Sequence, residues 1–370
     1  MQYDAAITAS AFTTALDATS LNATTKSVIA DILDLDVSSS TVAAAGYNGK
    51  SLSLTVDPVT GALQTPEFVS LDVAGAAGTN VTIPVGPTLA NASVFLINSE
   101  ANITFTVGNA ITTQATVDAS GIARAIISGS GDDTITVTDN VNTLVDAGAG
   151  NDKITTAGGN DVVILNGGNN TVSTGAGEDL IYTGNGNDKV DAGSGYDVVQ
   201  VSGRLSDYTV STSNGAVVLT SSTGSLNLTN VQFIKDSTGT DTLAVASNNA
   251  EATTLRLYEA LLNRDADATG AQTWTGVLAG NGNNLTQIAN GFLNSAEYGA
   301  THGNQTDAQF IQSLYNNALD RNGSIGAEEL VYWAQQLATG QTRADVAVGI
   351  VGSVEAQNHS SGVIVVTGQV

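Results

Sequence analysis

A nine-residue period in the middle of the chain limits its possible folds more than any other feature. Between residues 148 and 199 an acidic or amide residue recurs every nine positions, with glycine two positions before it and an apolar residue two positions after it. This pattern, G-x-D-x-U with U apolar, occurs six times without a gap, at Asp152, Asp161, Asn170, Asp179, Asp188 and Asp197. Six in-phase copies indicate a repeat architecture, in which short units stack and share one core.

Glycine is the second constant element of the repeat. The glycines two positions before the acids are Gly150, Gly159, Gly168, Gly177, Gly186 and Gly195, and further glycines stand at Gly148, Gly175, Gly184 and Gly193. The apolar positions are Ile154, Val163, Val172, Ile181, Val190 and Val199. An outlying copy contains Gly131, Asp133 and Ile135, and residues 138–146 are degenerate. Since glycine reaches left-handed conformations freely, its regular use indicates tight turns.

The repeat resembles the nonapeptide of the RTX family, G-G-x-G-x-D-x-U-x, which forms a calcium-binding parallel β-roll. The resemblance covers roughly residues 128–200, about a fifth of the chain. It implies that calcium is bound by the acids and glycine turns, namely Asp133, Asp152, Asp161, Asn170, Asp179, Asp188, Asp197, Gly131, Gly148, Gly150, Gly159, Gly168, Gly175, Gly177, Gly184, Gly186, Gly193 and Gly195. The first family glycine is absent from every copy, Ala157 and Asn166 replace the second in two copies, and Asn170 replaces one aspartate. The weakest sites are therefore expected near Asp161 and Asn170.

Calcium chemistry explains why such turns must act in pairs. The ion takes six to eight oxygen ligands at about 2.3–2.6 Å, more than one turn supplies. A glycine-rich turn adds backbone carbonyls and the aspartate adds charge, so each ion is expected between two turns. In a two-sided roll, turns on one side recur every eighteen residues, which predicts one column of Asp152, Asn170 and Asp188 and another of Asp161, Asp179 and Asp197. Carboxylates at the strand spacing of about 4.8 Å repel one another, and a divalent ion removes the repulsion.

The small apolar content of the repeat makes its folding depend on metal. We expect residues 129–200 to be disordered in chelator and rich in β-structure at millimolar calcium, the range in which many extracellular modules operate. The segment would then stay unfolded in low-calcium cytosol and fold outside the cell. The alternative is a metal-free glycine-rich solenoid, which has no need for stacked aspartates.

The composition of the chain favours cations as partners. Its 370 residues include 35 Asp and Glu against 11 Lys and Arg, which gives a net charge of −24. Nucleic acid and anionic membranes are attracted by basic patches, so neither is expected as a partner. There is no cysteine for disulfides or thiolate metal sites. Residues 1–20 lack the basic region of a signal peptide, and no apolar run approaches the ~18 residues that span a bilayer. Secretion would therefore use a route that does not read the N-terminus.

The sequence predicts a mixed, multidomain protein around this roll. Residues 1–46 show helical apolar spacing, and residues 47–128 are rich in β-branched residues interrupted by Gly, Asn and Pro, as in a β-rich section. Residues 129–200 form the predicted parallel β-roll, a β-solenoid. Residues 201–247 alternate polar and apolar side chains as antiparallel strands do, and would cap the open edge of the last coil.

Residues 251–360 are predicted to form a duplicated all-α module. The stretches LYEALLNRDADATGAQTW and LYNNALDRNGSIGAEELVYW share Leu-Tyr, Leu-x-Arg, a glycine and a tryptophan, and LNSAEY and VGSVEA correspond further along. The module resembles a helical domain of unknown function that accompanies calcium repeats in bacterial secreted and surface-layer-like proteins. Its signature R-x-P-D-x-x-G-x-x-Y-W is carried by Arg264, Asp267, Gly270 and Trp274, whereas Ala266 and Thr273 depart from it. The resemblance implies no catalytic role.

Two loops of this module also begin like an EF-hand calcium loop. They are DADATG at residues 265–270 and DRNGS at residues 320–324. Neither has the glutamate expected at position twelve, where Gly276 and Val331 stand. We therefore interpret both as polar helix-capping turns, with metal binding as the alternative. The paired aromatic residues Tyr258, Trp274, Tyr315 and Trp333 are interpreted as core packing.

No catalytic constellation is visible, so we expect that the protein is not an enzyme. The sequence contains no G-x-S-x-G, no phosphate-binding glycine loop and no H-E-x-x-H. The leading hypothesis is a secreted, calcium-stabilised structural protein of a bacterial surface or extracellular matrix, which self-associates in a surface layer, filament or biofilm scaffold, with cell-surface polysaccharide as a further partner. The alternatives are a calcium-dependent adhesin or ligand-binding module, whose recognition surface would lie in residues 47–128, and the remnant of an RTX enzyme or toxin. In the RTX family, an uncleaved C-terminal signal directs export through a type I channel, and the tail 361–370 is compatible with such a signal.

Overall fold

The computed structural model describes residues 6–37, 39–48, 51–57, 59–86, 89–108, 121–321, 325–360 and 362–369. The chain divides into two compact units, residues 1–231 with Val370 and residues 232–369. Parallel strands dominate the first unit and helices dominate the second. The prediction of a mixed, multidomain protein with a parallel β-roll and a C-terminal helical module is therefore confirmed.

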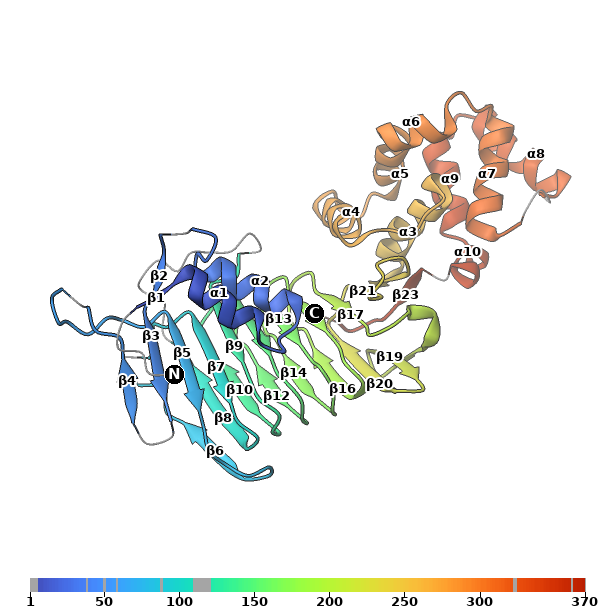
Figure 1. Ribbon diagram of the computed structural model, residues 1–370. Coiled ribbons are helices and arrows are strands. Elements are labelled where there is room, and N and C mark those ends of the chain that lie inside the picture. Colours follow the sequence, from blue (N-terminus) through green and yellow to red (C-terminus); the bar gives the residue numbers. More distant parts are fainter. Residues whose placement is uncertain are drawn as a thin grey trace. The chain divides into compact units, whose positions relative to one another are not determined.

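Two stacks of short strands form the body of the first unit (Figure 1). In this unit, one sheet has the strand order β4 (Leu52–Leu54), β3 (Ala44–Tyr47), β5 (Phe68–Asp72), β7 (Val94–Asn98), β9 (Arg124–Ile127), β11 (Thr143–Asp146), β13 (Val162–Ile164), β15 (Leu180–Tyr182), β17 (Val198–Gln200). Neighbouring strands are parallel except for the antiparallel pair of β3 and β4.

The second sheet of this unit faces the first. Its strand order is β18 (Thr209–Ser213), β19 (Ala216–Ser221), β20 (Gly224–Thr229), β16 (Gly186–Asp191), β14 (Thr171–Ser173), β12 (Lys153–Thr155), β10 (Thr134–Val137), β8 (Asn102–Val107), β6 (Asn80–Ile83). The strands from β6 to β16 and on to β20 pair in parallel, whereas β18, β19 and β20 form an antiparallel meander. The short 3₁₀-helix η1 (Leu205–Asp207) precedes the meander.

Each coil of the repeat contributes one strand to each sheet, and the apolar position of every copy faces the interior between the sheets. Side chains alternate along a strand, and the acid and the apolar residue stand two positions apart, so both point inward. The apolar residues pair in register as Ile154, Val172 and Val190 in one sheet and as Val163, Ile181 and Val199 in the other. All six are buried. The interior of the repeat coils is thus one aliphatic side chain deep on each sheet.

Parallel coils begin well before the repeat. Phe68 pairs with Val94 in the first sheet, and Phe105 pairs with Ile135 in the second. The rings of Phe95 and Phe105 meet between the sheets with their centroids 5.2 Å apart. The section that the sequence indicated only as rich in strands therefore continues the same winding, with a bulkier interior.

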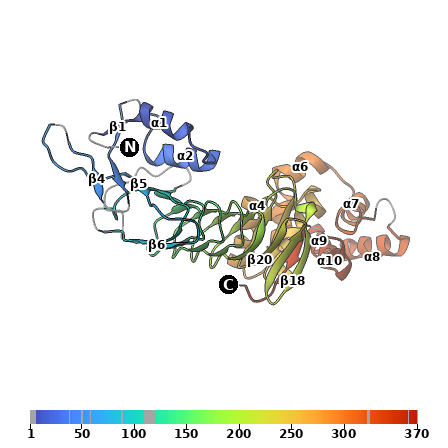
Figure 2. The same ribbon diagram turned by 60° about the horizontal axis from the view of Figure 1, so that its bottom comes forward.

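The N-terminal segment forms a helical hairpin that packs on the outer face of the first sheet (Figures 1 and 2). Its elements are β1 (Ile7–Thr8), α1 (Ala9–Asp17), α2 (Ala23–Ile32) and β2 (Thr41–Val42), with β1 and β2 antiparallel. Phe12 meets Phe68 edge to face at 4.9 Å. The side chain of Asn22 caps α2, and its amide donates to Oδ2 of Asp146 (3.0 Å). Apolar burial and one polar anchor thus hold the hairpin.

The second unit combines a small sheet with a bundle of helices. Strands β21 (Phe233–Lys235) and β22 (Thr242–Ala246) are antiparallel, and β23 (Val363–Val365) pairs in parallel with β22. The helices are α3 (Asn249–Leu257), the π-helical turn η2 (Tyr258–Leu262), α4 (Ala268–Gly280), α5 (Leu285–Leu293), α6 (Ala296–His302), α7 (Asp307–Leu319), α8 (Ala327–Ala338), α9 (Arg343–Val351) and α10 (Val354–His359). The strands of the predicted segment 201–247 thus divide between the two units. No helix in the described part of the chain has both the length and the apolar character needed to cross a membrane.

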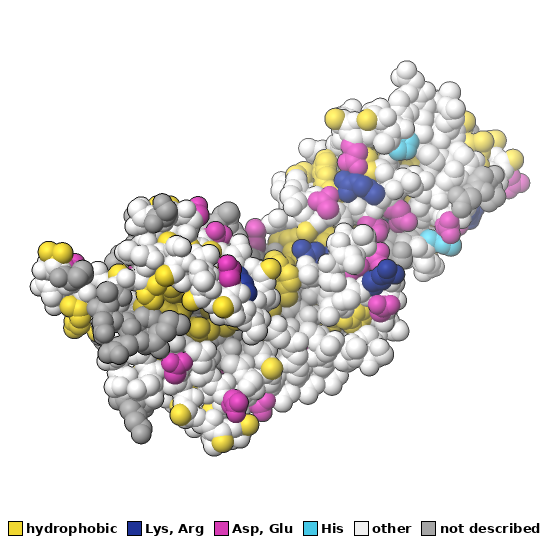
Figure 3. Space-filling view, in the orientation of Figure 1, with side chains coloured by type: hydrophobic (Ala, Val, Ile, Leu, Met, Phe, Trp, Pro, Cys, Tyr) yellow, Lys and Arg dark blue, Asp and Glu magenta, His cyan; other side chains and the backbone are white. Residues whose placement is uncertain are grey.

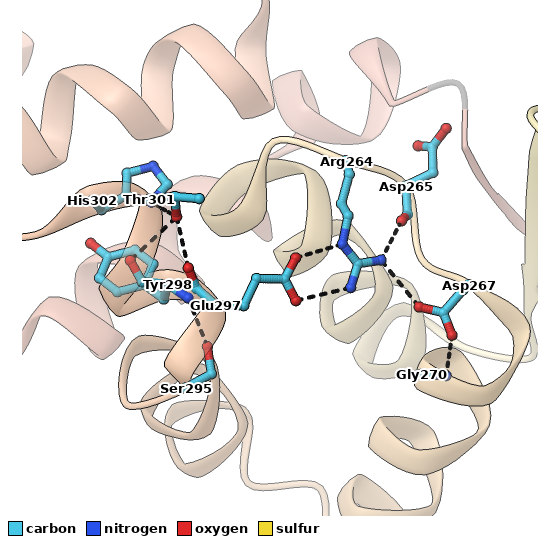
Figure 4. A network of polar contacts seen from close by, with 9 residues as sticks. All are labelled: Arg264, Asp265, Asp267, Gly270, Ser295, Glu297, Tyr298, Thr301 and His302. Carbon is cyan, nitrogen blue, oxygen red and sulfur yellow. Dashed lines mark hydrogen bonds and ion pairs between the residues drawn. The ribbon is translucent and has the colours of Figure 1, made fainter.

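Matching ion pairs relate the two halves of the helical module. Arg264 forms a two-pronged pair with Glu297 (2.6 and 3.1 Å), and Arg321 forms the same pair with Glu355 (2.6 and 2.7 Å). Figure 4 shows the first of these networks, in which Asp267 also contacts Arg264. The glutamates lie in the corresponding stretches LNSAEY and VGSVEA. The duplication in the sequence is therefore also a duplication of contacts.

The loops that begin like EF-hands serve the ends of helices as far as they are described. Asp267 is the N-cap of α4, where it accepts from the backbone N–H of Gly270 (2.9 Å). Residues 322–324 of the second loop lie outside the described residues, as do residues 361 and 370 of the predicted tail. The prediction of core packing holds for Tyr258 and Tyr315, which are buried, whereas Trp274 and Trp333 are half-buried. The ring of Trp274 stacks on that of Phe292 with centroids 4.5 Å apart, and Trp333 donates to the hydroxyl of Tyr315 (3.0 Å).

Candidate calcium-binding turns of the roll

The acids of the repeat lie buried at the two edges of the roll. Five of them directly precede a strand, and Asp188 lies within β16. They stack in two columns: the Asn170 column is Asp152, Asn170 and Asp188, and the Asp179 column is Asp161, Asp179 and Asp197. All six side chains are between 0 and 2% exposed. The visible face of the roll accordingly carries few charged groups (Figure 3). The eighteen-residue spacing expected from the sequence is the spacing that the structure brings together.

One carboxylate oxygen of each acid in the Asp179 column is fixed by the backbone. The N–H of Asp161 donates to Oδ1 of Asp179 (2.7 Å), and the N–H of Asp179 donates to Oδ1 of Asp197 (2.9 Å). Oδ1 of Asp161 accepts in the same way from the N–H of Thr143 (2.8 Å). Each acid is thereby held against the coil before its own.

The Asn170 column uses the same bonds but contains one neutral residue. The N–H of Asp152 donates to Oδ1 of Asn170 (2.8 Å), and the N–H of Asn170 donates to Oδ1 of Asp188 (2.9 Å). The side-chain amide of Asn170 donates to the same oxygen of Asp188 (2.9 Å). Asn170 thus separates two carboxylates and supplies a hydrogen-bond donor between them. Fewer charges need compensation here than in the Asp179 column.

The second carboxylate oxygen is the feature that fits a cation. Oδ2 of Asp152, Asp161, Asp179 and Asp188 is buried and makes no hydrogen bond to any residue that the structure describes. A buried charged oxygen without a partner costs several kcal/mol on general grounds, by roughly the amounts that buried polar groups lose on desolvation. Four such oxygens along two short columns are therefore well placed for a bound positive charge.

The surroundings of these carboxyls oppose their ionisation when no cation is present. Burial raises the pKa of Asp152, Asp161 and Asp197 to about 7. The neighbouring charge of Asp179 raises the pKa of Asp161 and Asp197 further in the same direction. Burial also raises the pKa of Asp179 and Asp188. A cation reverses this effect, because it favours the ionised form.

Glycine turns bring backbone carbonyls to the same edges. At Gly150, Gly168 and Gly186 φ is +134°, +102° and +121°, in the range that glycine adopts without strain. A Cβ on Gly168 would overlap the carbonyl oxygen of Gly150, and a Cβ on Gly186 would overlap that of Gly168. Among the predicted ligand glycines, Gly131 and Gly184 alone lack a positive φ. The turns therefore stack so closely that only glycine fits.

Calcium at these turns would need carbonyl oxygens besides the carboxylates. Within the described ranges, no three Asp, Glu, His or Cys side chains converge on one point. One or two carboxylates and the stacked carbonyls of neighbouring turns together form an all-oxygen donor set, which is the chemistry that calcium prefers. The residues thus fit the ion that the sequence pattern implies.

Two of the predicted ligand positions have different surroundings. Oδ1 of Asp133 accepts from the N–H of Ile103 (2.7 Å), and its Oδ2 accepts from the hydroxyl of Ser128. Neither oxygen of Asp133 is left without a donor, unlike the oxygens of the main array. At Asn170, Oδ1 accepts from the N–H of Asp152 and Nδ2 donates to Oδ1 of Asp188. The strongest candidates are therefore the four aspartates with an open Oδ2.

The replacement of the second glycine by Asn166 has a structural reason. Its amide donates to Oδ1 of Asp146 (2.7 Å), whose Oδ2 accepts from Asn22 and from the hydroxyl of Thr25 (2.7 Å). Asn166 therefore helps to hold the residue that anchors the N-terminal helices. This departure from the repeat serves the docking of another segment.

An exposed ladder of amides lies beside the Asn170 column and was not predicted from the sequence. The N–H of Asn169 donates to Oδ1 of Asn151 (2.8 Å), and the N–H of Asn187 donates to Oδ1 of Asn169 (2.9 Å). The ladder starts earlier with Asn102 and Asp132. Its signal in the sequence is an asparagine directly before the acid in all three copies of this column, and Asn160 has the same place before Asp161. These bonds stabilise the turns without metal.

Comparison with protein families agrees with this geometry. Residues 137–172 and 164–199 match the model of the RTX calcium-binding nonapeptide repeat in four copies, and residues 252–302 and 289–360 match a domain of unknown function (DUF4214). No curated protein and no solved structure matches the chain. The first unit therefore contains RTX calcium-binding nonapeptide repeats, and the second unit contains a domain of the DUF4214 family.

Proposed function

We propose that the chain is a secreted structural protein whose repeat coils fold and assemble when calcium binds between their turns. The observation that carries the proposal is the row of buried Oδ2 atoms at Asp152, Asp161, Asp179 and Asp188 that have no donor among the described residues. These four carboxylates and the stacked glycine carbonyls would hold the ions. Bound calcium supplies the positive charge that the columns lack.

The chain's own residues prepare the sites for this role. Backbone N–H groups fix Oδ1 of each aspartate and leave Oδ2 as the open ligand. Because neighbouring coils share each ion, binding at one turn favours order in the next. Low calcium inside a cell then keeps the repeat unfolded, which suits passage through a type I channel, and the higher calcium outside completes folding. The match to RTX repeats supports this route.

The open sheet edge at β18 supports self-association. β18 is the last strand of its sheet, and all five residues from Thr209 to Ser213 are exposed and uncharged. Strand β6 forms the opposite edge of the same sheet. An unprotected edge strand offers its backbone groups to another chain, and pairing of β18 with β6 of the next copy would be head to tail and give a filament. We therefore favour a filament or matrix scaffold, without enzymatic activity, which could also contact cell-surface polysaccharide.

Calcium binding is tested by isothermal titration of chelator-treated full-length protein, followed by circular dichroism at the same calcium concentrations. We expect calcium uptake together with a gain of β signal. No uptake at millimolar calcium would contradict the proposal.

Assembly is tested by electron microscopy of the calcium-loaded protein and of the variant with Val210→Lys and Thr212→Lys on β18. Two added charges should block edge pairing while calcium uptake is unchanged. We expect filaments or sheets from the unmodified chain and monomers from the variant. Monomers from both proteins would instead favour an adhesin or a ligand-binding module.

A further inference from the structure

The Asp179 column ends in a buried arginine rather than in another acid. One coil before Asp161, the aspartate position is occupied by Thr143, whose N–H donates to Asp161. One coil earlier still, strand register places Arg124 opposite Thr143. Read from its C-terminal end, the column is therefore three aspartates, a threonine and an arginine.

Arg124 is completely buried and tied to one acid. Its Nη1 and Nη2 donate to the two carboxylate oxygens of Asp139 (2.8 and 2.9 Å) and form a bidentate salt bridge. The side chain of Arg124 is 0% exposed, and that of Asp139 is 16% exposed. Its Nε makes no hydrogen bond to any described residue. A guanidinium does not lose its proton in proteins, so this positive charge is permanent.

The turn that Arg124 holds corresponds to the calcium turns of later coils. Residues 139–142 connect β10 to β11, as residues 157–160 and 175–178 connect the following strands on the same edge. The later turns contain glycines, whereas the turn 139–142 is Asp-Asn-Val-Asn and contains none. The chain has thus exchanged the glycine-rich turn for an arginine and aspartate pair at one coil.

Arg124 stands two coils before Asp161, the first acid of the column. Thr143, whose N–H donates to Oδ1 of Asp161, is paired in register with Arg124. A cation carried by the chain therefore stands at the end of the column where the next calcium ion would otherwise be needed.

We propose that Arg124 is a built-in substitute for a calcium ion, which closes the N-terminal end of the Asp179 column and holds the turn 139–142 in the absence of metal. Arg124 is in this sense a positioning residue for the first calcium-dependent coil. The inference rests on the proposed calcium binding by the repeat. It implies that the boundary between metal-independent and metal-dependent coils lies directly after residue 146, and not at residue 129 as the sequence alone predicts.

Hydrogen exchange of the full chain, resolved by peptide, tests where this boundary lies. In the unmodified protein, we expect amides of residues 124–146 to stay protected in chelator, and amides of residues 157–200 to become protected only with calcium. Fast exchange of residues 139–146 in chelator would overturn the inference without any variant being made.

The variant Arg124→Met separates a cation substitute from an ordinary structural ion pair. We expect residues 139–146 to lose protection in chelator and to regain it at saturating calcium, with the calcium midpoint for folding of the repeat raised roughly threefold or more. Arg124→Lys keeps the charge and should stay close to the unmodified midpoint. Arg204→Met, which removes an exposed arginine of the same unit, is the matched control.

The outcomes distinguish this inference from the proposed function. If protection in Arg124→Met is lost equally with and without calcium, or if its midpoint equals that of Arg204→Met, Arg124 is not a substitute cation. If the unmodified protein takes up no calcium in the titration, the proposed function itself fails.

Discussion

The two halves of the roll share one winding but bury different kinds of side chain. The early coils, from β3 to β10, bury large side chains such as Phe95, Phe105 and Ile103 between their sheets. In the repeat coils, residues 147–200, each strand points one aliphatic side chain of the repeat inward, and a column of acids is buried at each edge. Burial of apolar surface contributes about 25 cal/mol for each Å² removed from water, so the large side chains of the early coils contribute more than the valines and isoleucines of the repeat. The repeat must obtain the difference from elsewhere.

This comparison leads to the hypothesis that the early coils are stable with or without metal, whereas the repeat coils fold only under some conditions. A hydrophobic interior stabilises a coil whether or not metal is present, whereas buried ionised carboxylates need a cation nearby. Arg124 and Ser128 lie where the two regimes meet, and each satisfies an acid with a group of the chain itself. Single side chains of the protein therefore compensate the acids at the boundary between the early coils and the repeat coils.

Removal of calcium should break the comparison most visibly. We expect residues 147–200 to lose their β-structure in chelator, while the coils from β3 to β10 keep theirs, because the early coils do not depend on acid columns. Circular dichroism gives the total loss, and hydrogen exchange locates it. Uniform loss along the whole roll would show that the early coils need the repeat as their template.

A cavity in the early coils should have the next largest effect. Phe105→Ala is expected to lower the free energy of unfolding by about 3–5 kcal/mol, the usual range for a buried phenylalanine, with and without calcium alike. Val172→Ala, the matched change in the repeat, should lower it by about 1–2 kcal/mol, and only when calcium is bound. Urea unfolding followed by peptide-resolved exchange measures both. Calcium dependence of the Phe105 effect would contradict the division into two regimes.

Two further variants test whether the charge of the two acidic columns determines calcium affinity. Asp179→Asn should weaken calcium uptake roughly tenfold, since a charged ligand is worth more than a neutral one by on the order of 1.5 kcal/mol. Asn170→Asp should act in the opposite direction, with tighter uptake and less protection in chelator. Isothermal titration measures the pair. Equal affinities in both variants would mean that the columns do not bind the ion.

The smallest expected effect is a response of the calcium-free repeat to pH. Burial raises the pKa of Asp152, Asp161 and Asp197 to about 7 from 3.8, so the folded repeat binds protons more tightly than the unfolded chain. Stability from these groups is fully present below about pH 4 and is lost as the pH rises through about 7. Protein freed of calcium on a chelating resin should therefore gain β signal between pH 8 and pH 5.5. Replacing the three aspartates by asparagine should remove this gain.

The fold class and the stacking of the acids could be predicted because the period is regular. A strict nine-residue repeat places Asp161, Asp179 and Asp197 eighteen residues apart, and two-sided winding then puts them in one column. Their role as calcium ligands stays a prediction. The ligand set could not be refined from the sequence, because the partners of Asp133 and Asn170 depend on neighbouring coils.

The early coils could not be predicted as part of the roll because their lengths are unequal. Phe68 pairs with Val94, which in turn pairs with Ala125, so no fixed period relates these strands. Arg124 was missed for a related reason. A single arginine among alanines and isoleucines follows no pattern, and its role becomes visible only when strand pairing places it at the end of the Asp179 column.

The hydrogen bonds at Asp146 give the N-terminal helices a dependence on the state of the repeat. Asn22 and Thr25, more than a hundred residues earlier in the sequence, donate hydrogen bonds to Oδ2 of this carboxylate, and Asn166 of the repeat donates to Oδ1. When the turn around Asn166 melts, the hairpin loses one side of its anchorage while its apolar underside remains. A fluorophore on an exposed position of α2 would then report, more than a hundred residues away in the sequence, whether the repeat is folded.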